Sequence, residues 1–178
     1  MGRTVPDRRR GARMPVKPLT VIGIDPGLAG ALVCLRAGEV LACLDLPIES
    51  GVGNRNRLSA PVLAHLVRDL LQAHGPCVAA VEAVSARPGQ GVSSMFGFGR
   101  SLGAIEGVLA ALGLAITYYS PAVWKRHHGL LGRPKDASRT RALELYPQAA
   151  GWLTRKKDHG RAEALLVAHL LLTAGKTS

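Results

Sequence analysis

Four carboxylates occur where a strand is expected to end or a helix to begin, positions from which side chains can meet at one site. Asp25 closes the apolar run "VIGID" and is followed at once by Pro-Gly, and Glu82 stands near the end of the apolar run "PCVAAVEAV". Asp158 and Glu163 lie in "KKDHGRAEALLVAHLLL", at the start of an apolar segment. An ionised carboxylate in apolar surroundings is costly unless it is paired or bound to a metal ion. These acids therefore need a partner.

A divalent metal ion is the partner that suits the four acids as a group. Carboxylate oxygens, with no cysteine and little histidine beside them, are ligands that Mg²⁺ prefers, and Mn²⁺ can substitute. Two such ions about 4 Å apart can activate water and stabilise the leaving oxygen in phosphodiester hydrolysis. Taken singly, Asp25 could form a turn, Asp158 could cap a helix and Glu163 could lie on the surface. Taken together, the acids favour a magnesium-dependent hydrolytic site.

The hydrophobic pattern predicts the elements that would position these acids. Short apolar runs predict five strands, at 19–25, 30–36, 39–46, 76–84 and 114–120. Helical spacing predicts helices from Ser59 to about Leu71 and at about 93–112, 121–128, 136–146 and 159–174. The polar segment 51–58 is expected to be a loop. The order βββαβαβα, with additional helices, indicates an α/β fold in which helices flank a five-stranded mixed sheet.

The composition indicates a polyanionic partner. The 178 residues include 23 Lys and Arg against 12 Asp and Glu, a net charge of +11. This imbalance favours nucleic acid, although a generally basic proteome would produce it too. Three cysteines, Cys34, Cys43 and Cys77, lack the spacing of a zinc site or a disulfide framework, so we expect reduced core residues in a cytoplasmic protein. No apolar run approaches the roughly 20 residues of a membrane span.

One folded domain is expected at 19–174, preceded by a disordered basic arm at 1–18. The arm holds Arg8, Arg9, Arg10 and three prolines and has little apolar surface to bury. The arm lacks the apolar region of a secretory signal. We expect an untargeted tail; the alternatives are that the arm is a transit peptide or that the protein starts at Met14.

Six segments form an ordered series along the chain: "GIDPG", "VEAV", "GVSSMFGFGRSLGAIEGVLAALG", "SPAVWKRHHGL", "PKDASRTRALELYP" and "KKDHGRAEALLVA". Together they resemble the RuvC-like Holliday-junction resolvases of the RNase H-like superfamily, especially versions from phage and proteobacterial genomes. The similarity runs from about residue 20 to 172. It implies an RNase H-like fold and a homodimer that nicks four-way DNA junctions symmetrically with Mg²⁺, in recombination, repair or phage DNA processing.

The resemblance also assigns the acids. Asp25 matches the family's first-strand acid and Glu82 the second. The segment "AEALLVA" matches the family's "ADALAIA", which makes Glu163 the final acid.

The remaining ligand departs from the family pattern. The family has an acid or a histidine three residues before the final acid, and this chain has Gly160 there. We expect Asp158, at a non-helical cap position, to be the ligand instead. His159 is expected to support it or to replace it, because His159 and Glu163 are four residues apart and share a helix face.

Basic residues near the predicted site are expected to bind the DNA backbone. By resemblance, Lys125 and Lys135 match lysines that the family keeps near its active cleft, where they act as point charges on phosphates. The basic surface extends over Arg126, Arg133, Arg139, Arg141, Arg155, Lys156 and Lys157. Of these, Arg139 and Arg141 are individually better explained as residues of an ordinary solvated helix face.

The helix expected at 93–112 has one side nearly without side chains. Gly99, Gly103, Gly107 and Ala111 recur every four residues along it. That side could pack on the chain's own sheet, or it could contact a second copy of the chain.

These observations predict a crossover junction endodeoxyribonuclease that works by two-metal phosphodiester hydrolysis. Two alternatives stay open. One is another RNase H-like nuclease that acts on flaps or RNA. The other is a non-catalytic junction-binding protein that has lost its metal site, and Gly160 is the reason to consider it.

Overall fold

The computed structural model describes residues 19–51, 56–83, 85, 89 and 91–174, so the predicted arm at 1–18 lies outside the described residues. Its centre is a five-stranded sheet in the order β3-β2-β1-β6-β7. The strands are β1 (Thr20–Asp25), β2 (Ala31–Arg36), β3 (Glu39–Asp45), β6 (Cys77–Glu82) and β7 (Ile116–Tyr119). β1, β2 and β3 pair antiparallel, whereas β6 runs parallel to both β1 and β7. The predicted α/β class and the mixed sheet are confirmed.

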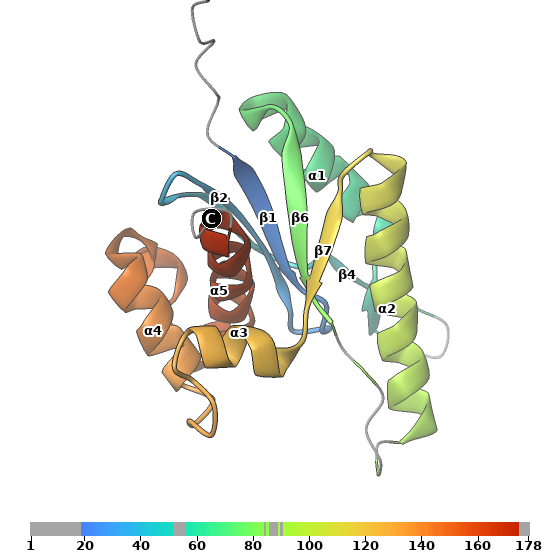
Figure 1. Ribbon diagram of the computed structural model, residues 1–178. Helices are drawn as coiled ribbons and strands as arrows, with labels where there is room; N and C mark the ends of the chain where they lie inside the picture. The colour runs from blue at the N-terminus through green and yellow to red at the C-terminus, as the bar shows by residue number, and fades with distance from the viewer. Residues whose placement is uncertain (1–18, 52–55, 84, 86–88, 90, 175–178) are drawn as a thin grey trace, which may run out of the picture.

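Helices cover both faces of the sheet (Figure 1). α1 (Ala60–His74) and α2 (Val92–Ala111) pack on one face. The other face is covered by α3 (Pro121–His127), α4 (Ala137–Leu145) and α5 (His159–Ala174). Two short 3-10 helices, η2 (Pro147–Trp152) and η3 (Lys156–Asp158), lead from α4 into α5. The structure confirms the predicted helices.

Burial on both faces explains the continuous apolar runs of the central strands. Along β1, Val21 belongs to the core under α5, whereas Ile22 and Ile24 belong to the core under α1 and α2. A strand covered on both sides needs apolar residues at every position. The three cysteines are buried free thiols, as predicted for core residues.

The predicted loop at 51–58 is wrong at its end. Asn56–Leu58 form β5, which pairs antiparallel with β4 (Ile48–Ser50) in a separate two-stranded sheet. Arg57 and Glu49 form an exposed ion pair of 2.8 Å across it. The sequence analysis missed β5 because only Leu58 is buried, so the strand has no apolar run to mark it.

α5 packs closely on β1 because both carry small residues where they cross. A methyl group at Gly23 of β1 would overlap the carbonyl oxygen of Ala164 and the side chain of Ala168 on α5. The close approach fixes the helix that carries Glu163 directly above the strand that carries Asp25. None of the described helices is both long and apolar enough to cross a membrane.

Candidate active site

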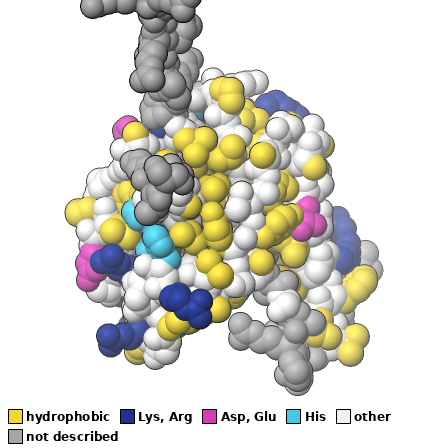
Figure 2. Space-filling model, viewed as in Figure 1, with side chains coloured by type: hydrophobic (Ala, Val, Ile, Leu, Met, Phe, Trp, Pro, Cys, Tyr) yellow, Lys and Arg dark blue, Asp and Glu magenta, His cyan; other side chains and the backbone are white. Residues whose placement is uncertain are grey.

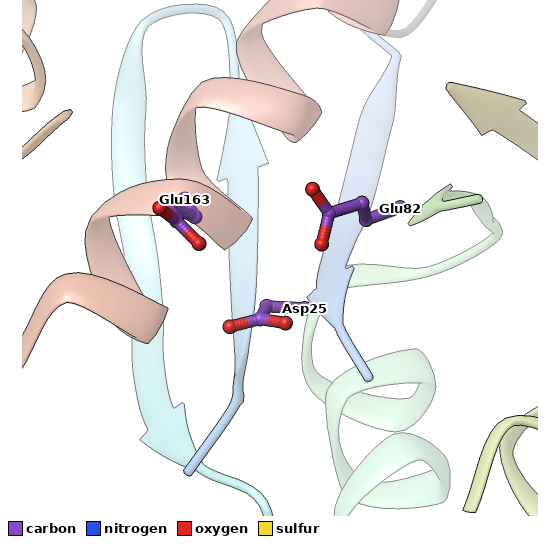
Figure 3. Close-up of side chains that lie close together, drawn as sticks. All are labelled: Asp25, Glu82 and Glu163. Atoms are coloured by element: carbon purple, nitrogen blue, oxygen red, sulfur yellow. The ribbon is translucent and has the colours of Figure 1, made fainter. Parts of the chain in front are cut away.

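Three of the predicted acids meet at one edge of the sheet (Figure 3). Asp25 ends β1 and Glu82 ends the parallel neighbour β6, and the register aligns Ile24 with Val81 just before them. Glu163 comes from the second turn of α5. Each side chain offers a carboxylate oxygen, and these three oxygens lie within 4.8 Å of one another. Parallel neighbours end at the same edge of a sheet, which is why acids far apart in the sequence come together here.

Burial and the charge of a neighbouring carboxylate raise the pKa values of Asp25 and Glu163. Burial, followed by the charge of Glu163, raises the pKa of Asp25 from 3.8 to about 6. Burial, followed by the charge of Glu82, also raises the pKa of Glu163, although Lys125 and Lys135 oppose that rise. The backbone N–H of Gly27 donates to Asp25 Oδ1 at 3.3 Å, so Asp25 also takes part in the β1–β2 turn.

The donor set fits a hard divalent cation. Three half-buried carboxylates provide only oxygen ligands, which Mg²⁺ and Mn²⁺ prefer. When all three carboxylates are ionised, a cation between them would offset the repulsion among their charges. The site is therefore suited to a hard divalent metal ion.

Trp124 holds Glu82 in place, a contact that the sequence analysis missed. Its indole Nε1 donates to Glu82 Oε1 at 2.9 Å, and the Trp124 side chain is completely buried. Lys125 Nζ lies 5.2 Å from the centre of the Trp124 ring. The only sequence signal was the position of Trp124 beside Lys125 in "SPAVWKRHHGL".

Asp158 lies apart from the three carboxylates in the described part of the chain. It directly precedes α5, as expected of a cap, but both of its oxygens accept hydrogen bonds from Arg155. Burial alone would raise the pKa of Asp158, but the hydrogen bonds and the charge of Arg155 lower it. Its role as a metal ligand stays a prediction.

Gly160 and His159 occupy the first turn of α5, next to Asp25. A Cβ atom at Gly160 would lie 2.5 Å from the carbonyl oxygen of Ala29 and 3.1 Å from Asp25 Oδ2. The charge of His159 lowers the pKa of Asp25, and its Nδ1 lies 3.5 Å from the carbonyl oxygen of Lys156. The ligand role of His159 also stays a prediction.

Two of the predicted DNA-binding lysines act on the carboxylates of this site, and the other predicted DNA-binding residues lie on the surface. Lys125 is half-buried on α3, and both it and Lys135 act electrostatically on Glu163. The other residues predicted to contact DNA are all exposed: Arg133, Lys156 and Lys157. Figure 2 shows Lys and Arg side chains at the lower left of this face, over the region of α3 and α4 in Figure 1. Their contacts with DNA stay predictions.

The small-residue side of α2 does not pack on the chain's own sheet. α2 buries Ser101, Ile105 and Leu109 instead. A Cβ atom at Gly103 or Gly107 would have no described atom within 4 Å beyond its own helix backbone and chain neighbours. The alternative of packing on the sheet is therefore wrong for these glycines.

Known proteins with similar sequences are DNA-junction enzymes by name, while no protein-family model matches the chain. The crossover junction endodeoxyribonuclease RuvC of Nitratidesulfovibrio vulgaris is 31% identical over 158 residues, which are 85% of this chain and 90% of that protein. The chloroplastic Holliday junction resolvase MOC1 of Chlamydomonas reinhardtii is 37% identical over 95 residues. This match covers 53% of the chain and only 11% of MOC1.

Two solved structures with a similar fold are structures of a RuvC protein. Thermus thermophilus RuvC in complex with a Holliday junction substrate matches with a TM-score of 0.57 at 16% identity, covering 89% of this chain and 97% of that one. A second structure of Thermus thermophilus RuvC matches with a TM-score of 0.54 at 18% identity, covering 89% and 96% of the two chains. These matches confirm the predicted RNase H-like fold. The fold and the identity shared along 90% of a bacterial RuvC show that this chain belongs to the RuvC family of crossover junction endodeoxyribonucleases.

Proposed function

We propose that this chain is a metal-dependent endonuclease that resolves four-way DNA junctions by nicking them. The observation that carries the proposal is the meeting of Asp25, Glu82 and Glu163 at the edge of a RuvC-like sheet. Two further findings support it: the relatives are named as junction-resolving enzymes, and one similar structure is a complex with a Holliday junction substrate.

Asp25, Glu82 and Glu163 would hold Mg²⁺, with Mn²⁺ as a substitute. When bound, such ions supply an activated water and stabilise the leaving oxygen in phosphodiester hydrolysis. The chain itself gathers the three carboxylates, and Trp124 fixes one oxygen of Glu82 by its hydrogen bond. Partial burial limits the access of bulk water, so the charges of these groups act on one another strongly.

Lys125 and Lys135 would hold the DNA backbone beside the carboxylates. The charges of Lys125 and Lys135 act on Glu163, so both lysines lie within electrostatic reach of it. A phosphate bound by the two lysines would therefore lie close to the three carboxylates. Arg133, Lys156 and Lys157 are exposed and would extend this contact. Lysine and arginine contacts to phosphates position nucleic acid without reading its sequence.

The enzyme would act as a homodimer, because a four-way junction has two strands to cut. The exposed small-residue side of α2 would let a second copy approach closely. Val92 and Phe96 at the start of α2 are 79% and 67% exposed, so this helix also offers uncovered apolar surface to a partner. The three buried free thiols are consistent with the reducing cytoplasm, where we place the protein.

A cleavage assay tests the proposed function. Synthetic four-way junction, linear duplex, flap and RNA/DNA hybrid are each incubated with the protein and Mg²⁺, with and without EDTA. We expect nicking of the four-way junction only when Mg²⁺ is available, and no nicking by the Asp25→Asn variant. Preference for flap or hybrid would instead indicate another RNase H-like nuclease. Tight junction binding without nicking would indicate a non-catalytic binding protein.

A further inference from the structure

Two arginine–aspartate pairs flank the start of α5. Arg161 donates from Nε to Asp45 Oδ1 at 2.6 Å and from Nη2 to Asp45 Oδ2 at 2.8 Å. Arg155 donates from Nε and Nη2 to Asp158 Oδ1 at 2.9 and 2.6 Å, and from its backbone N–H to Oδ2 at 2.7 Å. Arg155 also lies 3.9 Å from Asp45, which joins the two pairs. We name Asp45, Arg155, Asp158 and Arg161 the arginine clamp.

The clamp connects β3 to the segment that leads into α5. Asp45 is the last residue of β3, and Arg161 also donates to the carbonyl oxygen of Trp152 at 3.1 Å. Exposed ion pairs usually contribute little. The arginine clamp differs from an isolated exposed ion pair in two ways. Asp158 is only 2% exposed, and Arg161 binds Asp45 through two hydrogen bonds. Breaking a pair with a buried member leaves an uncompensated charge, so the arrangement resists displacement.

The first turn of α5 also packs on the β1–β2 turn through Gly160. A Cβ atom at Gly160 would lie 2.5 Å from the carbonyl oxygen of Ala29 and 3.2 Å from Gly30 Cα. The first turn of α5 is therefore held between this backbone contact and the clamp. Glu163 follows Arg161 by two residues on this helix, so its distance from Asp25 depends on where the turn is held.

We propose that the arginine clamp is a positioning device that places Glu163 against Asp25, and that Asp158 serves the site by holding Arg155 and not as a metal ligand. The inference rests on the proposed function, because it assumes that the three carboxylates bind a metal ion. To bind metal, Asp158 would have to exchange its three hydrogen bonds from Arg155. A side chain at position 160 would meet Ala29, so the fourth carboxylate cannot come from there.

The test measures Mn²⁺ binding to the full chain by titration calorimetry without DNA. We compare wild type with Asp158→Asn, Arg155→Gln and the double variant. The clamp predicts that each single change weakens Mn²⁺ affinity by about tenfold, as for other residues that orient ligands, and leaves the number of ions bound unchanged. The double variant should bind no more weakly than the weaker single variant, because both changes break the same pair.

The second pair gives an independent measurement. Asp45→Asn keeps the size of a side chain that is 61% exposed, so the chain is expected to fold, and it should weaken Mn²⁺ binding to a similar degree. Arg161→Lys should weaken binding less than Arg161→Gln, because it keeps the charge and loses the paired hydrogen bonds. Glu49→Gln is the matched control, since it removes an arginine-paired carboxylate in the separate β4–β5 sheet and should leave Mn²⁺ affinity unchanged.

Two outcomes would overturn the clamp while leaving the proposed function in place. In the first, Asp158→Asn abolishes Mn²⁺ binding or lowers the number of ions bound, while Arg155→Gln binds like wild type. In the second, all the clamp variants bind like wild type. Wild type that binds no Mn²⁺ would overturn the proposed function and the clamp with it. Circular dichroism checks that each variant is folded, and should Asp158→Asn fail to fold, the Asp45 and Arg161 variants decide.

Discussion

At the scale of single residues, Asp25 shows how the site opposes stability. Its pKa rises from 3.8 to about 6 on folding, because burial and Glu163 disfavour the charged form. Between these two pH values the folded protein binds more protons than the unfolded chain, so the free energy of unfolding falls as pH rises through this window. Above the window the loss is complete. A bound cation would offset this loss, so metal binding is expected to raise the free energy of unfolding.

Asp25→Asn is therefore expected to stabilise the metal-free protein while it abolishes nicking. The amide keeps the size of the side chain and removes the buried charge, and the pKa rise from 3.8 to about 6 corresponds to at most about 3 kcal/mol at neutral pH. Denaturant unfolding in EDTA measures the effect, which should be smaller at about pH 5, where wild-type Asp25 is largely protonated when folded. Equal stabilisation at both pH values, or full nicking by the variant, would contradict this account.

At the scale of secondary-structure elements, α3 supports the active site through a contact with Glu82. Trp124 is its buried anchor, and the hydrogen bond to Glu82 connects the helix to the end of β6. Lys125 follows on the same short helix. α3 therefore joins a carboxylate of the site to a lysine that is expected to hold DNA.

Trp124→Phe tests this connection. The change keeps an aromatic ring and removes the donor to Glu82, so we expect a stability loss of about 1–2 kcal/mol and at least about a tenfold loss of nicking. Junction affinity should stay within about twofold, because Lys125 remains. Trp152→Phe on η2 is the control for lost ring volume, as Trp152 is half-buried on the same side of the sheet. Equal losses of nicking in both variants would show that the hydrogen bond is unimportant.

The elements could be predicted because hydrophobic periodicity is local. Central strands buried on both faces read as continuous apolar runs, and acids at their ends stand out against that background. β5 was missed because its pairing with β4 leaves most of it exposed and polar. The bond from Trp124 to Glu82 and the clamp from Arg161 to Asp45 join segments far apart in the chain, and no local pattern reports such contacts. The close contact of Gly160 with Ala29 likewise depends on how α5 packs against the β1–β2 turn.

At the scale of the whole molecule, the net charge of +11 contrasts with the acidic centre. Three carboxylates repel DNA phosphates, so binding depends on the basic residues around them. Lys125 and Lys135 are the two whose charges act on Glu163. They are therefore the best placed to hold the backbone near the carboxylates.

Lys125→Ala and Lys135→Ala should each weaken junction binding and lower the slope of log affinity against log salt concentration by up to about one unit. Each lost phosphate contact releases fewer counterions, which is the cause of the lower slope. Arg141→Ala is the matched control, because Arg141 is paired with Glu144 on α4 at 2.8 Å. It should change the slope less. Lysine variants that keep the wild-type slope would place both residues on an ordinary solvated surface.

The small-residue side of α2 is the surface through which we propose that two copies of the chain meet on a junction. Gly103 and Gly107 are exposed and four residues apart, so they lie on one helix face with open space in front of them. Replacing both with Leu would block a close approach of a second copy, yet it should leave the monomer fold intact. Leucine also favours a helix over glycine by nearly 1 kcal/mol per position, so thermal stability of the monomer should rise.

Sedimentation of wild type should therefore show a dimer, and the Gly103→Leu/Gly107→Leu variant should show a stable monomer. Coordinated cutting needs two sites on one junction, so the variant should release singly nicked junctions before fully resolved products. Gly151→Leu on η2 is the control, since a Cβ atom there also has no described neighbour within 4 Å beyond adjacent residues, and it should stay dimeric. A double variant that still sediments as a dimer and resolves junctions in one binding event would place the dimer contact on another surface.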